Sequence, residues 1–262
     1  MSMTKRSQAV VRGAWCVNGT ERSLPDSRTT HHTPRPFVLV NMAMSADGKI
    51  ATANRAVSTF SSERDHDHLY KLRATADAVM SGARTVDSND YTLGPGTERF
   101  RKLRLRRGLA EYNLRVIVSG SGSVNPRAEI FRHRFSPILV LTSERAPAKA
   151  LKKLRTVADE VKVVGRAEVD FPAALRWLHR EWNVKRLLCE GGGELNDALF
   201  RAGLVDELHL TICPRVIGGR LAPTIADGLG FTHLADACRL QLRSTRRVGD
   251  ELFCVFRRAN SK

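Results

Sequence analysis

The chain has 262 residues, 42% of them hydrophobic, and its 43 lysines and arginines outnumber its 27 aspartates and glutamates, giving a formal net charge of +16. No apolar run approaches the ~18 residues of a membrane span, and the amino terminus lacks the apolar core of a secretory signal. We therefore expect a globular cytoplasmic protein without a membrane segment. Its five cysteines are scattered and predicted to be reduced and mostly buried: Cys16, Cys189, Cys213, Cys238 and Cys254.

Residues 1–36 are predicted to be a flexible tail, because Ser, Thr, Arg, His and Pro mix there without periodicity. The adjacent His31 and His32 in this tail are interpreted as solvated side chains, and no metal site is expected. One domain, residues 37–262, is predicted to follow.

This domain opens with the apolar run FVLVNMAM, which predicts a buried strand that meets the turn SADGK. Two interpretations of this turn stay open. Asp-Gly is a common turn pair, so Asp47 can simply cap the turn. Alternatively, Asp47 and Lys49 line a pocket for a polar or anionic substrate.

Helices and strands then alternate along the chain. Ser62 offers an N-cap with Asp65 at capping-box spacing, and a further helix is expected to start at Thr85. The segment 94–113 is predicted to be a charged connection. Strands are predicted at 76–82, 114–120, 136–143 and 161–165, and helices at 146–158 and 171–183.

The carboxyl-terminal third begins with a strand that runs through three glycines into a helix (LLCEGGGELNDALF). An alternating strand follows at 207–213, and the segments 238–244 and 251–257 resemble an antiparallel pair joined by the turn RRVGD. Strands that alternate with helices and finish antiparallel predict a mixed sheet in a single α/β domain.

The glycine-rich segment is the candidate phosphate site. Gly191, Gly192 and Gly193 would let a ligand approach the backbone, and the helix N-terminus that follows favours negative charge. A tight strand-to-helix turn would explain the same glycines. Glu190 stands at the strand's carboxyl end, where open α/β sheets place their ligands.

Two further side chains have a functional and a structural interpretation. The Thr85 hydroxyl would either cap its helix or bind a cofactor phosphate or ribose. Arg73 lies beside an apolar helix stripe, where it would either bind a phosphate or remain a surface side chain. Motifs of serine hydrolases, zinc proteases, P-loop proteins and Rossmann dinucleotide sites are absent from the sequence. Hydride transfer, which needs neither a covalent nucleophile nor a metal, fits this inventory.

The run RFRKLRLRR, residues 99–107, holds six basic residues in nine. Such a run can bind nucleic acid through its phosphates. It is more often a solvated loop or helix face, and Phe100 is the one aromatic residue within it. We therefore regard nucleic-acid binding as the weaker interpretation.

Several motifs, taken in order, resemble a known family. MSADGKIA, LRATADAVMSGARTV, LLCEGGGELNDALFRAGLVDEL, ICPRVIGG and APTIADGLGF resemble the reductase domain of the riboflavin biosynthesis protein RibD. They are more similar still to stand-alone archaeal and fungal diaminopyrimidine reductases. The resemblance extends from about residue 36 to residue 257.

This resemblance implies a dihydrofolate-reductase-like three-layer fold, in which helices flank a central mixed, mostly parallel sheet. It also implies a homodimer with NADPH as hydride donor and a phosphorylated pyrimidine nucleotide as substrate, whose ribosylamino group is reduced to ribitylamino. The implied cofactor-binding residues are Met44, Ser45, Thr85, Asn89, Gly120, Ser121, Gly191, Gly192, Gly193 and Glu194. Arg73, Glu190 and Asp47 would bind the substrate, and Asp47, Lys49 or Glu190 would serve in catalysis.

The sequence departs from the family pattern at TVDSNDYTL. Asn89 stands where a cofactor-contacting aspartate is typical, and Tyr91 replaces a proline. The arginine that usually follows shortly after, and helps hold the substrate phosphate, is missing from its place in LGPGTERF, and Arg99 or Arg101 is the candidate substitute. An NADPH-dependent reductase of the same fold acting on a pterin or another pyrimidine therefore stays open. The family's zinc deaminase domain is absent, because no H-x-E pairs with a P-C-x-x-C.

Overall fold

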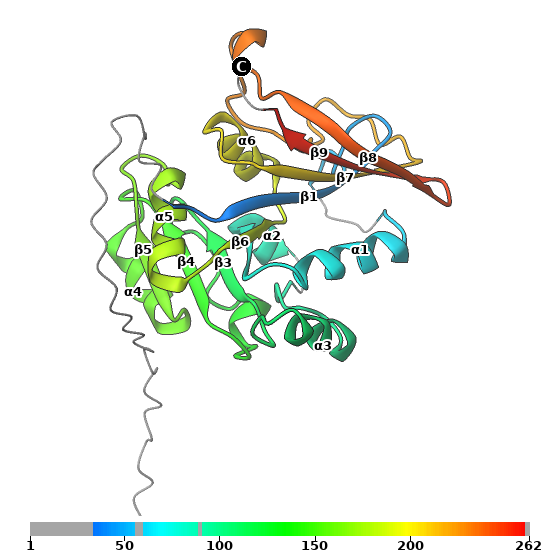
Figure 1. Ribbon diagram of the computed structural model, residues 1–262. Helices are drawn as coiled ribbons and strands as arrows, with labels where there is room; N and C mark the ends of the chain where they lie inside the picture. The colour runs from blue at the N-terminus through cyan, green and yellow to red at the C-terminus, as the bar shows by residue number, and fades with distance from the viewer. Residues whose placement is uncertain (1–33, 56–59, 89–90, 260–262) are drawn as a thin grey trace, which may run out of the picture. The chain divides into compact units, whose positions relative to one another are not determined.

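The computed structural model describes residues 34–55, 60–88 and 91–259 (Figure 1). Within them, nine strands form one sheet in the order β5-β4-β3-β2-β6-β1-β7-β9-β8. The strands are β1 (Phe37–Ser45), β2 (Ala78–Gly82), β3 (Leu114–Val118), β4 (Ile138–Thr142), β5 (Glu160–Val163), β6 (Arg186–Cys189), β7 (Glu207–Cys213), β8 (Leu240–Val248) and β9 (Glu251–Arg258). The helices are α1 (Glu63–Arg73), α2 (Ala83–Ser88), α3 (Glu98–Arg106), α4 (Ala148–Val157), α5 (Phe171–Trp182) and α6 (Gly193–Arg201).

The sheet is parallel from β5 to β7, whereas β9 runs antiparallel to both of its neighbours, β7 and β8. Alternate residues of each inner strand face opposite sides, so two apolar cores form. Val38 and Val40 of β1 belong to the core that α5 and α6 cover. Leu39, between them, belongs to the core that includes residues of α1, α2 and α4. The predicted mixed, mostly parallel sheet with flanking helices is confirmed.

Local sequence signals explain where the helices begin and end. Ser62 caps α1, accepting a hydrogen bond from the backbone N–H of Asp65, as the spacing predicted. Asp170 caps α5 in the same way, and Asn183 ends that helix in the left-handed conformation. Helix α2 begins at Ala83, two residues before the predicted start at Thr85.

The expected charged connection at 94–113 contains a helix, α3, so that prediction is wrong over residues 98–106. The helix forms because Phe100 and Arg104, four residues apart, share one buried face. The Phe100 ring stacks on Tyr70 of α1 with centroids 5.3 Å apart. In the final hairpin, β8 continues through residue 248, so the turn is shorter than the predicted RRVGD.

The predicted tail, residues 1–36, lies outside the described residues except for 34–36, and His31 and His32 are among those left out. Arg35 is held by a bidentate ion pair with Asp206, at 2.7 Å for each contact. Cys189, Cys213 and Cys254 are buried free thiols. None of the helices in the described ranges is long and apolar enough to cross a membrane.

Candidate active site

A cleft of about 1060 Å³ opens at the carboxyl ends of β2, β3 and β6. Its walls also include the middle of β1, one side of each of the helices α1, α2 and α6, and the loop 223–229, together with residues 50–55, 60–61, 145 and 167–171 in part. Ligands of parallel α/β sheets bind outside the carboxyl ends of the strands, so the cleft lies where the topology predicts a site. Its volume accommodates more than one small molecule.

One part of this cleft is a glycine cradle, which we define as Thr85, Gly120, Ser121, Gly192, Gly193 and Glu194. These residues come from α2, the turn after β3 and the start of α6. The sequence predicted all of them for cofactor binding, and the structure brings them to one cleft. Gly192 occupies the N-cap of α6, and no side chain caps that helix. Its first N–H groups are therefore available to an anion.

The glycines differ in what they make possible. Gly192 has a φ of +57°, and a Cβ there would approach only the Thr85 hydroxyl, at 3.6 Å. It thus combines a glycine conformation with open space for a ligand. Gly191 does not line the cleft, and a Cβ on it would lie 2.5 Å from the Met42 sulfur. Its carbonyl accepts hydrogen bonds from the Gly82 N–H and the Ser81 hydroxyl, which join β6 to β2.

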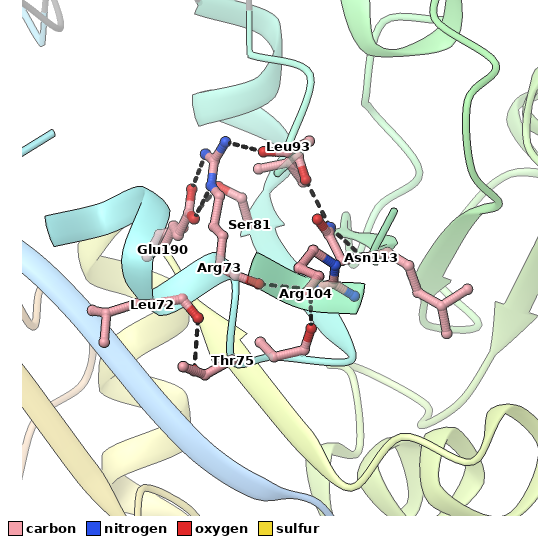
Figure 2. Close-up of polar contacts among 12 residues, drawn as sticks. Leu72, Arg73, Thr75, Ser81, Leu93, Arg104, Asn113 and Glu190 are labelled. Atoms are coloured by element: carbon pink, nitrogen blue, oxygen red, sulfur yellow. Dashed lines mark hydrogen bonds and ion pairs between the residues drawn. The ribbon is translucent and has the colours of Figure 1, made fainter. Parts of the chain in front are cut away.

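Arg73 and Glu190 point toward each other and form a buried bidentate ion pair (Figure 2). Arg73 Nε and Nη2 each donate to Glu190 over 2.6 Å, and Nη1 donates to the Gly94 carbonyl over 2.6 Å. Each side chain is 5% exposed. Burial alone would lower the pKa of Arg73, but the charge and hydrogen bonds of Glu190 outweigh it and raise the pKa.

Only Glu190 of this pair lines the cleft. The family resemblance implies that both residues face a pyrimidine nucleotide. The structure instead directs the Arg73 guanidinium to Glu190 and to the 93–96 loop, so Arg73 holds a carboxylate at the edge of the cleft.

At the end of β1 and in the turn that follows, the side chains of Ser45, Asp47 and Lys49 hydrogen-bond within the protein. Asp47 is exposed, and it accepts hydrogen bonds from the Ser45 hydroxyl (2.5 Å) and the backbone N–H groups of Gly218 (2.7 Å) and Ile217 (3.1 Å). The bond from Ser45 and then the two backbone bonds lower the pKa of Asp47 to about 2. Asp47 therefore caps its turn, as in the first of the two interpretations that the sequence left open.

Lys49 Nζ donates to the Ala222 carbonyl over 2.9 Å, so it too fastens the turn to a distant loop. Met44, Ser45, Asp47 and Lys49 are not among the described residues that line the cleft. Asn89 lies outside the described residues, so its predicted cofactor contact stays a prediction.

Two buried polar residues of the cleft were missed by the sequence analysis. Asn41 of β1 and Asp65 of α1 both line it, and the Oδ1 atom of each is buried without a hydrogen-bond partner among the described residues. The spacing of Asp65 from Ser62 is a capping signal, and that signal explains the residue in the sequence without any need for a ligand. Asn41 lies inside the apolar run FVLVNMAM. A polar residue in such a run is the signal from which its place in the cleft could have been predicted.

The basic run 99–107 forms contacts within the chain. Arg104 is buried, and its guanidinium donates to the carbonyl oxygens of Arg73, Ala76 and Ala110 over 2.6–2.9 Å (Figure 2). Burial lowers the pKa of Arg104 to about 10. Arg99 pairs with Asp67, and Lys102 pairs with Glu98. The run is thus largely used in packing α3 and in local ion pairs, which weakens the nucleic-acid interpretation.

The sequence model of the RibD C-terminal domain matches residues 36–254. The chain is 36% identical to the 2,5-diamino-6-ribosylamino-4(3H)-pyrimidinone 5′-phosphate reductase of Methanothermobacter thermautotrophicus, over 85% of this chain and 98% of the relative. It is 38% identical to the reductase of the same name from Archaeoglobus fulgidus, over 86% and 99%. A pyrimidine reductase-like protein from Corynebacterium diphtheriae superposes with a TM-score of 0.70 at 25% identity, covering 86% of this chain and 93% of that one.

Proposed function

The chain belongs to the RibD C-terminal domain family, and we propose that it is an NADPH-dependent reductase in riboflavin biosynthesis. Its substrate would be 2,5-diamino-6-ribosylamino-4(3H)-pyrimidinone 5′-phosphate, for which the similar archaeal reductases are named. The observation that carries the proposal is the convergence of three separate chain segments, at Thr85, Gly120 and Gly192, on one cleft.

The residues of the glycine cradle fit a dinucleotide. The uncapped N-terminus of α6 suits its pyrophosphate, and the Thr85 and Ser121 hydroxyls line the same wall. Gly192 leaves the space that close approach to the backbone requires. When bound, NADPH supplies the hydride that reduces the sugar C1′ of the ring-opened substrate.

Arg145 is the cation we assign to the extra phosphate that distinguishes NADPH from NADH. It is exposed, lines the cleft, and follows Ser143, whose hydroxyl donates to the Gly120 carbonyl over 2.8 Å. This path places Arg145 next to the Gly120–Ser121 turn of the cradle. A guanidinium is well suited to a phosphate, because its N–H groups donate in parallel.

We favour Glu190 as the catalytic candidate over Asp47 and Lys49, because Glu190 is among the described residues that line the cleft and those two are not. Both carboxylate oxygens of Glu190 accept hydrogen bonds from Arg73, which fixes the side chain at the edge of the cleft. We therefore assign it to orienting the ribosylamino group of the substrate, and water in the cleft to supplying the proton.

Fluorescence titration with NADPH, with NADH alongside, tests the cofactor assignment. We expect NADPH to bind at least about tenfold more tightly, and Arg145→Met to remove that preference while retaining NADH affinity. Arg155→Met, on the outer helix α4, is the control. Failure of the wild-type protein to bind either nucleotide would contradict the proposed function.

We also propose a homodimer that acts in the cytoplasm. The outermost strand, β8, is exposed along almost all of its length, and Leu242 on it is 54% exposed, which suits pairing with a second copy. The buried free thiols suit a reducing compartment. Light scattering of the purified protein gives the mass that tests the dimer.

A further inference from the structure

Two buried carboxylates line the cleft, and they differ in their partners. Glu190 is neutralised by the bidentate pair with Arg73. Asp65 is 5% exposed, its Oδ1 atom has no hydrogen-bond partner, and it takes part in no ion pair within the described part of the chain. A buried carboxylate without donors is costly to the folded state.

The Asp65 carboxylate has a modest role in the fold. Helix α1 is capped through the backbone N–H of Asp65 and the Ser62 side chain, so an uncharged residue at position 65 would preserve the cap. The negative charge lies in the first turn of α1, where it is favourable, but it leaves the buried Oδ1 atom without a donor. A buried oxygen without a donor on a residue that lines a cleft is a candidate for ligand recognition.

Asp65 belongs to a wall of the cleft separate from the glycine cradle. This wall comes from β1 and α1, where Asn41, Asp65 and Leu69 line the cleft. Tyr91 also lines the cleft. Its pKa is raised, first by burial and then by the charges of Glu190 and, more weakly, Asp65, so Tyr91 lies near both carboxylates. If the cradle holds the cofactor, the wall of α1 and β1 is a surface on which the pyrimidine can lie, and it carries the two buried Oδ1 atoms without a partner.

We propose that the Asp65 carboxylate binds the N3–H and 2-amino groups of the pyrimidine ring, and so selects a 2-aminopyrimidinone over the corresponding uracil. The inference rests on the proposed function. The two oxygens of a carboxylate accept two parallel N–H groups, as they do from a guanidinium. A 2-amino-4(3H)-pyrimidinone presents such a pair along its C2–N3 edge.

The uracil differs from the 2-aminopyrimidinone at C2, the position that this carboxylate would contact. Solved relatives of the fold include a reductase named for 5-amino-6-(5-phosphoribosylamino)uracil, from Thermotoga maritima. In that substrate a carbonyl oxygen replaces the 2-amino group, so it would face the Asp65 carboxylate with an acceptor. A hydrogen bond would be lost and two negative oxygens would be brought together, which is a strong basis for discrimination.

The orientation of the ring follows from where the reaction occurs. The reacting sugar carbon is carried by the amino group on C6, which must approach the cofactor. The C2–N3 edge lies on the opposite side of the ring, so it points away from the glycine cradle. The buried wall of α1 and β1 is the part of the cleft suited to receive it.

The test compares kcat/KM for the diaminopyrimidinone and the aminouracil substrates in the wild type, Asp65→Asn and Asp67→Asn. Asparagine is nearly the same size as aspartate and offers an N–H to the 2-carbonyl and an oxygen to N3–H. We expect the wild type to prefer the diaminopyrimidinone at least about 100-fold, and Asp65→Asn to reduce that ratio at least tenfold. Asp67, half-buried, absent from the cleft lining and paired with Lys71 and Arg99, is the matched control and should leave the ratio unchanged.

A ratio that is the same in Asp65→Asn as in the wild type would overturn the inference and leave the proposed function standing. If the wild type reduces neither compound, the proposed function fails. Calorimetric binding of the two pyrimidines without NADPH then decides about Asp65: a wild-type preference that Asp65→Asn loses supports the inference, and equal binding overturns it.

The melting temperature without ligand separates recognition from a structural role. Asp65→Asn keeps the size of the side chain and the cap of α1, and gives up only the favourable placement of a carboxylate in the first helical turn, so its Tm should stay close to that of the wild type. A lower Tm for Asp65→Asn than for Asp67→Asn would mean that the carboxylate supports the fold, and would overturn the inference.

Discussion

Replacing Arg73 with methionine should strongly destabilise the protein. The pair with Glu190 has two contacts of 2.6 Å, each side chain is 5% exposed, and Nη1 also holds the Gly94 carbonyl. Methionine fills most of the space but leaves Glu190 buried without its cation. The cost of breaking a buried pair from one side is about 3–5 kcal/mol.

Urea unfolding of the ligand-free protein measures this cost. Lys71→Met is the control, because Lys71 lies on the same helix but forms an exposed ion pair with Asp67, worth about 0–1 kcal/mol. Arg73→Met/Glu190→Leu should recover part of the loss, with a coupling energy of about 2–3 kcal/mol between the two sites. A loss below about 1 kcal/mol for Arg73→Met would show that water reaches Glu190, and the buried pair would be refuted.

Three further predictions concern α3, the cradle and α1. Arg104→Met should cost about 2–4 kcal/mol in unfolding free energy, because three backbone carbonyls lose their donor, whereas the exposed Arg106→Met should change it by less than about 0.5 kcal/mol; similar losses would count against the buried role. Gly192→Ala should weaken NADPH binding about tenfold or more, since a methyl group enters the cradle, and Gly108→Ala, also at positive φ but with open space around it, should not. Burial, then the nearby His209 and Arg246, lower the pKa of His68 to about 4. As the pH falls from about 6.5 to 4, His68 therefore takes up a proton in the unfolded chain but not in the folded protein. The free energy of unfolding drops over that range. His68→Gln should lessen this drop in Tm, and parallel Tm profiles would contradict it.

The fold could be predicted because its signals are local. The apolar run of β1, the glycines between β6 and α6, and the cap at Ser62 each fix an element from neighbouring residues. Helix α3 could not be predicted because only one apolar side chain, Phe100, lies on its buried face. A buried arginine, Arg104, occupies the position where an apolar side chain would have indicated a helix face.

The site was only partly predictable because its side chains meet across long stretches of sequence. Arg73 and Glu190 are 117 residues apart, and nothing in either segment indicates that each neutralises the other. Asp47 is satisfied by backbone N–H groups 170 and 171 residues away, so its turn is closed by a partner that the sequence does not reveal. The glycine cradle was predictable because glycines and helix starts at strand ends carry their own signal.

Hydride transfer from NADPH to the sugar C1′ is the step on which the proposed function depends. The decisive measurement incubates the purified protein with 2,5-diamino-6-ribosylamino-4(3H)-pyrimidinone 5′-phosphate and NADPH in which both hydrogens on C4 of the nicotinamide are deuterium. The product is then examined by mass spectrometry and NMR. We predict a ribitylamino product with one deuterium on C1′. Unchanged substrate, or a product without deuterium at that carbon, would contradict it.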